Sequence, residues 1–346
     1  MSGTTVALVM PNYNHARFLE KSLDGLLGQS RPADEIIVID DDSTDNSRDI
    51  IKEKLDPAPN ARWMKNDRNM GVIHSMNRLL REAQSDWICF PAADDFLFPD
   101  FVRMLEPVAW QNPNVAFVSA AVEIWDGNDN RTGVRPIFFP SLKPKVFSPA
   151  EVRTLLSQSD NHFLGQVTLY RRELLLAAGG FDDSLGSGTD GMVLRDLALE
   201  HGFGFVPRRL GVWRLHGENY SHASAFNVPK FRELIGAMTA HIRRKPEGFY
   251  PAGYAELFAR RVRFGVVRLM LGRPERDGHL AEDIADLLDL RGTEKRLVRW
   301  LTELRYASNV FVLSWAYWKL WPFSPFRFLL QPFRRRLAEW RVARAS

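Results

Sequence analysis

The chain has 346 residues, of which 45% are hydrophobic and 25% are charged. This length can bury a substantial core and is long for one domain, so we expect a main domain with an appendage. Cys89 is the only cysteine, which excludes an intrachain disulfide and indicates a reducing compartment. No basic leader follows Met1, and no apolar run reaches the roughly 18 to 20 residues that span a bilayer. The sequence therefore predicts a soluble or surface-bound protein.

The first hundred residues alternate short apolar runs with segments of helical periodicity. The expected strands are Val6–Met10, Glu35–Ile39, Trp63–Met64 and Ile88–Phe90, and expected helices follow Asn14 and Gly71. The order βαβαβαβ predicts an α/β fold with a mostly parallel sheet covered by helices. Right-handed crossovers place the carboxyl ends of these strands at one edge of the sheet.

Acidic residues follow two of the expected strands at that edge. The pair Asp94–Asp95 comes after the strand at 88–90, and the run Asp40–Asp42 comes after the strand at 35–39. Open α/β sheets bind ligands at the carboxyl ends of their strands, where two carboxylates suit a divalent cation that holds a phosphate. An acidic pair after a strand is also typical of a solvated turn or a helix cap. We expect Tyr13 to lie beside both acidic segments.

The C-terminal segment differs in charge and aromatic content from the rest of the chain. Residues 301–346 carry eight basic and two acidic side chains, a net charge of +6, whereas the whole chain has +4. Half of the ten tryptophans lie at Trp300 and beyond. Such a mixture suits the headgroup boundary of an anionic bilayer, so we expect membrane-surface attachment. The alternatives are helical packing, internally or in a homo-oligomer, and nucleic-acid binding, which no recognised nucleic-acid motif accompanies.

A series of motifs resembles, in order and spacing, those of family 2 glycosyltransferases with the GT-A fold. The matching segments are Val9–Asn14, Ile37–Asp45, Asn69–Gly71 with Asn77, Asp94–Asp95, Gly179–Asp182, Asp190 with Leu194–Arg195, and Trp213–His216. The resemblance implies a Rossmann-like catalytic domain at residues 1–224. An α-helical region would follow at residues 225–346 and would end in the basic, aromatic tail from about residue 300.

The resemblance also assigns a donor site for a nucleotide-diphosphate sugar. Asp41 matches the aspartate that accepts a hydrogen bond from the nucleobase, and Pro11 and Tyr13 line the base and ribose pocket. Simple packing is the alternative for Tyr13. The residues implied to bind the nucleotide sugar are Pro11, Tyr13, Asp41, Asn69, Gly71, Asp94 and Arg214.

A divalent cation, Mg²⁺ or Mn²⁺, is implied beside the diphosphate. Asp94 and Asp95 match the end of the family's Asp-x-Asp segment, but Ala92 stands where many relatives have its first aspartate. Either carboxylate can be the ligand, and a weak metal requirement is expected. His216 stands where some GT-A enzymes supply a third ligand or a diphosphate contact; a structural role is the alternative.

Asp190 is the residue expected to act as the general base. It lies in the glycine-rich stretch Gly186–Gly191, directly before a helix expected to start near Met192, and an N-cap role is the alternative. The reaction needs a carboxylate that takes the proton of the acceptor hydroxyl on the face opposite the departing diphosphate. The hydroxyl then attacks an anomeric carbon with oxocarbenium character.

These assignments predict a glycosyltransferase that uses a nucleotide-diphosphate sugar, most readily a UDP-sugar, with inversion. A glycan or lipid-linked acceptor is expected, in polysaccharide, O-antigen or other glycoconjugate synthesis, at the inner face of the cytoplasmic membrane. Two other classes remain open. A nucleotide-sugar-binding scaffold without turnover would agree with Ala92. A metal-dependent nucleotidyltransferase or phosphohydrolase would use strand-end carboxylates but leaves Asp190 and Trp213–His216 unexplained.

Overall fold

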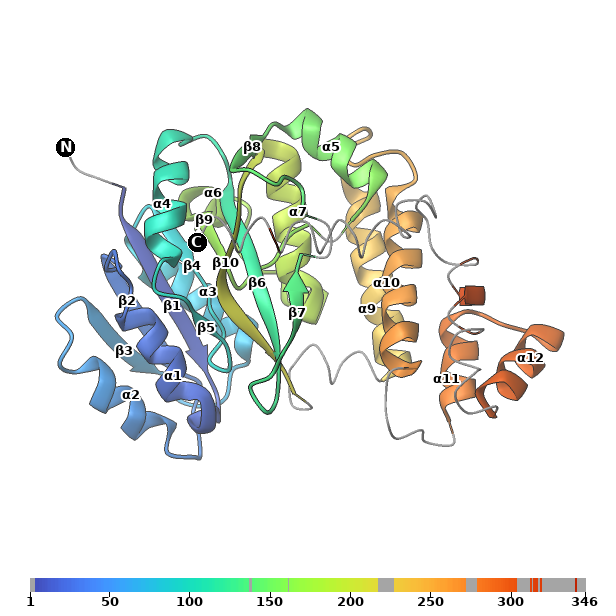
Figure 1. Cartoon of the computed structure of the whole chain (residues 1–346), viewed down its shortest axis with the longest axis horizontal. Coiled ribbons are helices and arrows are strands. Elements are labelled where there is room, and N and C mark those ends of the chain that lie inside the picture. Colours follow the sequence, from blue (N-terminus) through green and yellow to red (C-terminus); the bar gives the residue numbers. More distant parts are fainter. Residues whose placement is uncertain are drawn as a thin grey trace. The chain divides into compact units, whose positions relative to one another are not determined.

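The computed structural model describes residues 4–136, 139–160, 162–216, 227–271 and 279–303, with residues 312, 314–316, 318 and 340 (Figure 1). The chain forms two compact units. Unit 1 contains residues 1–155, 161–216 and 330–346, and unit 2 contains residues 156–160 and 217–329. The predicted boundary at residue 224 and most of the predicted basic tail, including Arg334–Arg336, lie outside the described residues.

The first half of unit 1 alternates strands and helices as predicted. In chain order the elements are β1 (Val6–Asn12), α1 (Ala16–Leu27), β2 (Glu35–Asp40), α2 (Ser47–Leu55), β3 (Ala61–Lys65), α3 (Val72–Glu82) and β4 (Trp87–Cys89). The four strands lie in the order β3-β2-β1-β4, and all three pairs are parallel. This half of the sheet confirms the predicted βαβαβαβ arrangement.

Burial on both faces explains the continuous apolar runs of the central strands. Every residue of Val6–Met10 has no exposed surface. Helix α1 lies in front of the sheet and α3 lies behind it (Figure 1), as right-handed crossovers on opposite sides of β1 require. In α1 the apolar residues Leu19, Leu23 and Leu26 fall on one helical face and are buried.

The second half of unit 1 extends the sheet with strands of both directions. Its elements are β5 (Phe96–Leu97), α4 (Phe101–Gln111), β6 (Phe117–Asp126), β7 (Arg131–Arg135), β8 (Lys145–Phe147), α5 (Pro149–Gln158, which continues into unit 2), β9 (Thr168–Arg171), α6 (Arg172–Ala177), the 3₁₀ helix η1 (Asp183–Gly188), α7 (Thr189–His201) and β10 (Phe203–Leu215). The full order is β3-β2-β1-β4-β9-β6-β10-β5, with β7 on β6 and β8 on β10. Strands β5, β7, β8 and β9 pair antiparallel with their neighbours. The α/β class is confirmed, and the sheet as a whole is mixed.

The described part of unit 2 is mainly helical. It contains α9 (Val228–Arg244), α10 (Tyr254–Leu271), α11 (Leu280–Leu287) and α12 (Gly292–Glu303). Asn227 caps α9 by accepting the Lys230 N–H at 3.1 Å. Arg232 on α9 pairs with Asp289, which follows α11, at 2.7 Å. The predicted helical character of the C-terminal region is therefore confirmed for these residues.

Candidate active site

Six strands of unit 1 end at one edge of the sheet because β1, β2, β3, β4, β6 and β10 run in the same direction. Asn12 at the end of β1 lies opposite Asp40 at the end of β2. The pair Asp94–Asp95 follows β4, and Arg214 is the penultimate residue of β10. We call this edge the carboxyl edge. It brings together predicted residues that lie far apart in the sequence.

A buried hydrogen-bond network fixes the ends of β1 and β2. The Asn12 side chain donates to Asp40 Oδ1 at 3.1 Å and to Ser43 Oγ at 3.2 Å. Asp40 Oδ2 accepts from the Ser43 N–H at 3.1 Å and from Arg48 Nε at 3.0 Å. Since Asp40 is fully buried and bound by these donors, it anchors the loop that carries Asp41.

Asp41 is also buried, and one loop surrounds its carboxylate with N–H groups. Oδ1 accepts from the Asn66 side chain at 2.6 Å and from the Met70 N–H at 2.9 Å, and Oδ2 accepts from the Gly71 N–H at 2.8 Å. Gly71 has φ +91°, a conformation that favours glycine, and its N–H also donates to Asn69 Oδ1 at 3.1 Å. A carboxylate has about four acceptor positions, so a nucleobase N–H is compatible with these three bonds.

Pro11 and Tyr13 flank the end of β1. Pro11 is half-buried in the strand, and Tyr13 directly follows Asn12. The Tyr13 side chain is 41% exposed, so it is a surface residue of the carboxyl edge and not a core residue. Asn14 fixes the following turn with φ +55°, and its side-chain oxygen accepts the Thr44 N–H at 2.8 Å. The Tyr13 ring is therefore available for contact with a ligand.

Asp94 faces the imidazole of His216. Asp94 Oδ2 and His216 Nε2 are 2.9 Å apart. The His216 ring stacks on Phe18 of α1, with ring centroids 5.0 Å apart, which fixes its plane. Burial acts to raise the pKa of the Asp94 carboxyl, but the His216 hydrogen bond and electrostatic interactions with His15 and His216 hold that pKa below its usual range. Asp94 is therefore the more acidic member of the acidic pair.

Asp95 is held by the backbone of β10. Its Oδ1 accepts the Arg214 N–H at 2.8 Å, and the residue is only 2% exposed. Burial and the neighbouring charge of Asp94 raise the pKa of Asp95 well above its usual range, and the Arg214 hydrogen bond and charge oppose this only in part. Arg214 Nη1 also donates to the Asp94 carbonyl at 2.7 Å. One arginine of β10 thus holds both residues of the acidic turn.

Asp190 lies in the first turn of α7 and not before the helix. The structure starts α7 at Thr189, three residues before the predicted start, and Gly188 occupies the N-cap position. Asp190 Oδ1 accepts the Gly191 N–H at 2.6 Å. Burial raises the pKa of the Asp190 carboxyl, and the Gly191 hydrogen bond and the charge of Arg195 oppose this in part. The carboxyl is therefore closer to the proton affinity that a general base needs near neutral pH.

The surroundings of Asp190 place it near β4. The charge of Asp190 acts on the Tyr170 hydroxyl, and Tyr170 on β9 lies opposite Ile88 on β4. Gly165 passes so close that a Cβ there would lie 2.7 Å from Asp190 Oδ2. A side chain at residue 165 would displace the Asp190 carboxylate, so the close approach of the two residues requires glycine at this position.

The donor atoms after β4 and β10 fit a cation whose remaining coordination positions are filled by a bound ligand and water. Within the described ranges, no group of three or more His, Cys, Asp and Glu side chains is arranged to hold a metal ion. Asp94 and His216 present two adjacent donors, whereas Asp95 Oδ1 accepts from the β10 backbone. Mg²⁺ sites commonly use one or two protein ligands and take the rest from water and substrate phosphates.

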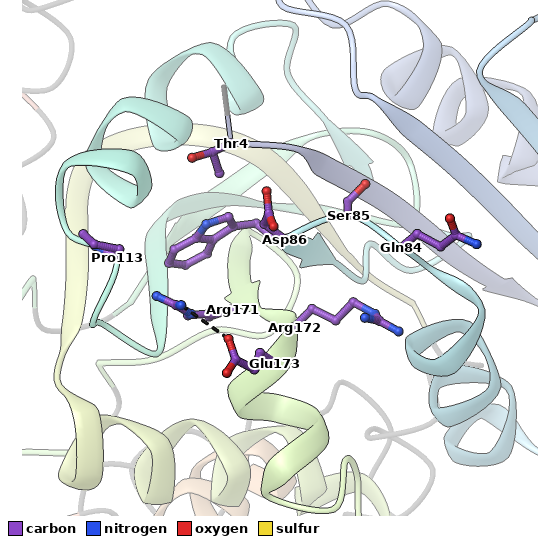
Figure 2. A pocket seen from close by; sticks show the side chains of 9 residues that line it. Thr4, Gln84, Ser85, Asp86, Pro113, Arg171, Arg172 and Glu173 are labelled. Carbon is purple, nitrogen blue, oxygen red and sulfur yellow. Dashed lines mark hydrogen bonds and ion pairs between the residues drawn. The ribbon is translucent and has the colours of Figure 1, made fainter. Parts of the chain in front are cut away.

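A pocket of about 230 Å³ lies at the opposite, amino-terminal edge of the sheet (Figure 2). Its charged side chains already bind within the protein: Asp86 accepts from Thr5 N and Oγ1 at 2.9 Å, and Arg172 Nε donates to the Leu80 carbonyl at 3.0 Å. Arg171 pairs with Glu173 at 3.4 Å. None of the sequence-predicted site residues lines this pocket.

Sequence reasoning did not assign several residues that shape the carboxyl edge. They are Asn12, His15, Phe18, Arg48, Asn66, Asp129 and Gly165. Asn12 and Asn66 had a usable signal, since each lies two residues beyond a predicted strand; in the structure Asn12 ends β1 and Asn66 directly follows β3. Asn77 lies in a matched motif and has a structural role, because its amide binds both the N–H and the carbonyl of Phe181, at 2.8 and 2.7 Å.

Comparison with known proteins agrees with this geometry. The sequence model described as glycosyl transferase family 2 matches residues 7–176. An uncharacterized glycosyltransferase of Nostoc sp. is 28% identical over 232 residues, which cover 66% of this chain and 70% of that protein. A UDP-Glc:α-D-GlcNAc-diphosphoundecaprenol β-1,3-glucosyltransferase of Escherichia coli is 28% identical over 128 residues, 37% of this chain and 49% of that protein.

Among solved structures, the chain is similar to a mannosyltransferase from Pyrobaculum calidifontis in complex with GDP-Man and Mn²⁺. The TM-score is 0.57 at 18% sequence identity, over 92% of this chain and 86% of that chain. This likeness extends the agreement from sequence motifs to the fold and confirms the GT-A architecture.

Proposed function

We propose that this chain moves the sugar of a UDP-sugar to an acceptor hydroxyl with inversion. The chain belongs to glycosyl transferase family 2 and is a glycosyltransferase that uses nucleotide-sugar donors. The observation that carries the proposal is the carboxyl edge. Asp41 follows β2 and the pair Asp94–Asp95 follows β4, on either side of β1, and Asp190 acts on Tyr170 of the next strand, β9. UDP is proposed because the E. coli relative is named for UDP-Glc. GDP is the alternative, since the Pyrobaculum mannosyltransferase is in complex with GDP-Man.

In the proposed donor complex, the base lies at Asp41 and the diphosphate lies at Asp94. The loop that binds Asp41 through the Asn66, Met70 and Gly71 donors is already ordered, so base binding need not order it. Tyr13 offers an exposed ring beside the base and ribose. Strands β2 and β4 are two strand spacings apart, on the order of 10 Å, which suits the span from the base to the diphosphate of an extended nucleotide.

Asp190 is proposed as the general base. Its raised pKa lets the carboxylate take the proton of the acceptor hydroxyl as that oxygen attacks the anomeric carbon. The glycosidic bond to the diphosphate breaks as the new bond forms, and the diphosphate leaves from the opposite face. Direct displacement with a single base inverts the anomeric configuration.

Asp94 and His216 are proposed to hold Mg²⁺ or Mn²⁺ when the donor is bound. Such a cation supplies positive charge to the diphosphate as it departs. Arg214 keeps the acidic turn in place through the Asp94 carbonyl and the Asp95 carboxyl. Asp95 is proposed to support the turn through Oδ1, which leaves only its second oxygen to contact the cation.

The other two classes make different predictions about products. A scaffold would bind nucleotide sugars without releasing the nucleoside diphosphate. A nucleotidyltransferase or phosphohydrolase would cleave within the diphosphate and release pyrophosphate, phosphate or a sugar phosphate. A glycosyltransferase releases the intact nucleoside diphosphate, so the phosphate-containing product separates the three classes.

The test is a screen of nucleotide sugars for protection against thermal unfolding, with UDP- and GDP-sugars, with and without Mn²⁺. A ligand at 100 times its Kd stabilises the folded state by about 2.7 kcal/mol, so the true donor stands out. Turnover is then followed by release of the nucleoside diphosphate. Protection by no nucleotide sugar, or release of pyrophosphate or phosphate, would contradict the proposal.

A lipid-linked acceptor at a membrane surface is proposed for the same reaction, in polysaccharide, O-antigen or related glycoconjugate synthesis. The E. coli relative is named for a diphosphoundecaprenol-linked acceptor. In unit 2, Leu297 and Trp300 are exposed apolar side chains on α12, beside the exposed Arg296, and Trp318 is 80% exposed. Within the described residues, every helix is too short or too polar to cross a bilayer. Attachment at the inner face of the membrane, through aromatic and basic side chains, is therefore proposed.

Flotation with anionic liposomes tests this attachment. The variant Trp300→Gln/Trp318→Gln should float much less than the wild type, and salt should weaken the remaining binding because it screens the basic side chains. Trp110→Gln on α4 is the matched control, since Trp110 is an exposed tryptophan of unit 1. If the wild type does not float at low salt, or if both variants float equally, the membrane proposal is wrong.

A further inference from the structure

A second pocket lies at the carboxyl edge, between α1 and the turn that joins β6 to β7. Its volume is about 370 Å³. Helix α1 contributes Arg17, Phe18 and Lys21, the turn contributes residues 127–129, and β10 contributes Arg214. We call it the basic pocket, since its lining includes three cationic side chains and one acidic side chain, Asp129.

The basic pocket has a fixed framework. Asp126 Oδ1 accepts the N–H groups of Asn128 and Asn130, each at 2.9 Å, which holds the β6–β7 turn closed. Arg214 Nε donates to Asp129 Oδ1 at 2.8 Å, and the Arg214 guanidinium lies between the Phe18 and Phe96 rings, at 5.3 and 5.0 Å from their centroids. The pocket therefore has a buried cation at its base that is positioned before any ligand binds.

The remaining cations of the pocket are on the solvent side. Arg17 and Lys21 are exposed and four residues apart, so they project from the same face of α1. Lys21 Nζ is 3.3 Å from Asp129 Oδ2, so Asp129 is shared by Lys21 and Arg214. Three positive side chains with one shared carboxylate leave a net charge of about +2 at the pocket, which favours an anion.

The basic pocket adjoins the reacting centre on the side away from the base. Phe18 lines the pocket and stacks on His216, and Arg214 joins the pocket to the Asp94 carbonyl. In the strand order β2-β1-β4-β9-β6-β10-β5, Asp41 follows β2, whereas Asp95 directly precedes β5, which pairs with β10 at the other end. The β6–β7 turn lies at this same end, because Leu215 of β10 pairs with Asp126. The pocket therefore lies on the β10 side of the acidic pair, and Asp41 lies on the β2 side.

We propose that the basic pocket binds an anionic group, a phosphate or a carboxylate, on the sugar acceptor. This inference rests on the proposed donor placement, because the nucleotide fills the edge from Asp41 to Asp94 and leaves the pocket to the other substrate. Arg17 and Lys21 contact the anion directly. Arg214 adds its positive charge at the base of the pocket and connects the bound anion to the acidic turn through its bond to the Asp94 carbonyl. Arginine and lysine are the side chains that bind phosphate and carboxylate groups most strongly.

The experiment is calorimetric titration of the full-length protein with two small anions, methyl diphosphate for a lipid-diphosphate headgroup and glucuronate for an acidic sugar. Each is titrated with the protein saturated by UDP or GDP and Mn²⁺, so that the donor site is filled, and again without nucleotide. The variant is Arg17→Gln/Lys21→Gln. The control is Lys52→Gln, which removes a positive charge from the exposed face of α2.

The expected result is that one anion binds the nucleotide-loaded wild type and the Lys52→Gln control equally. The Arg17→Gln/Lys21→Gln variant should bind it at least tenfold more weakly, with unchanged nucleotide affinity. Binding should weaken with added salt, because the contacts are between charges at a solvent-exposed site. Preference for methyl diphosphate identifies a phosphate-bearing acceptor, and preference for glucuronate identifies an acidic glycan.

Three outcomes overturn the proposal. They are no binding of either anion to the nucleotide-loaded wild type, equal binding by the double variant, and loss of nucleotide affinity in the double variant, which would assign the pocket to the donor. Failure of the proposed glycosyltransferase function gives a different result from failure of the anion site, because the protein would then bind no nucleotide at all. The titration without nucleotide would still report whether Arg17 and Lys21 bind an anion.

Discussion

Asp41 and the pair Asp94–Asp95 lie on the same edge of one sheet but are held in different ways. The Asp41 carboxylate is held by N–H groups of residues 66–71, only 25 to 30 positions away in the chain. The acidic pair is held by Arg214 and His216, about 120 positions away. The base end is therefore a local structure of the first half of unit 1, whereas the reacting end depends on β10 being in register with the first half.

This difference predicts that substitutions at the base end weaken donor binding, whereas substitutions at the reacting end weaken the chemical step. Variants at the two ends separate these effects, and the largest is expected at the reacting end.

Asp190→Asn should lower kcat on the order of 10³-fold and leave donor affinity nearly intact, because an amide cannot take the acceptor proton. Steady-state kinetics and nucleotide titration give the two readouts. Asp183→Asn, an exposed acid in the preceding 3₁₀ helix, is the control and should behave as the wild type. Turnover near the wild-type rate in Asp190→Asn would remove Asp190 from the role of general base.

Asp94→Asn and Asp95→Asn should differ, although the two residues are adjacent. Asp94→Asn removes the charge beside His216, and we expect loss of metal stimulation and about a 100-fold lower kcat/KM, or ~2.7 kcal/mol. Asp95→Asn can keep the bond from the Arg214 N–H through its amide oxygen, so we expect less than about a tenfold loss. The double change Asp94→Ala/Asp95→Ala should abolish any response to Mg²⁺ or Mn²⁺.

The metal dependence of all three variants is measured by activity and by nucleotide titration with and without Mn²⁺. Equal effects of the two single substitutions would show that the pair acts as a unit. An unchanged metal response in the double variant would make the pair structural and would leave the cation without these ligands.

The residues at the base end could be predicted from sequence because their positions follow from strand periodicity. Asp41 directly follows a buried apolar run, and the run itself fixes the edge at which its carboxylate lies. The loop that binds Asp41, residues 66–71, follows the next strand, β3. Local pattern and spacing were enough here.

The contacts of the reacting end could not be predicted in the same way. Arg214 and Asp129 meet because β10 lies parallel to β6, and this register includes two irregularities that no local pattern indicates. Strands as short as Phe96–Leu97 carry no periodic signal, so the sequence does not indicate which strands of the mostly parallel sheet run antiparallel. The sequence predicts too late a start for α7 because Gly186 and Gly188 are typical of a loop, whereas the structure begins the helix at the buried Thr189, directly after Gly188.

Asp41→Asn should weaken donor binding by about tenfold, or ~1.4 kcal/mol, with little effect on kcat. The amide that replaces one carboxylate oxygen must face an N–H donor of Met70 or Gly71, so the loop also loses a bond and stability falls by about 1–3 kcal/mol. Asp42→Asn is the matched control, since Asp42 has φ +63°, which asparagine tolerates. Thermal unfolding and nucleotide titration of both variants decide the outcome; equal behaviour would remove the special role of Asp41.

The pH dependence of kcat/KM should show the smallest effect. Asp190 acts when ionised, and its pKa is raised, so activity should fall as pH falls through a value above the usual range for aspartate. Arg195→Met removes a charge that lowers this pKa and should move the acid limb to higher pH, whereas Arg195→Lys keeps the charge and should not. An acid limb that stays in place in Arg195→Met would mean that another group controls it.

The most direct test is anomalous diffraction from crystals of the protein with Mn²⁺ and the nucleotide that the screen selects. The proposed mechanism predicts a manganese peak at bonding distance from Asp94 and His216 Nε2, with the diphosphate on its other side and the base against Asp41. A nucleotide bound elsewhere, for example in the pocket of Figure 2, or a manganese ion remote from Asp94, would contradict the proposed use of the carboxyl edge.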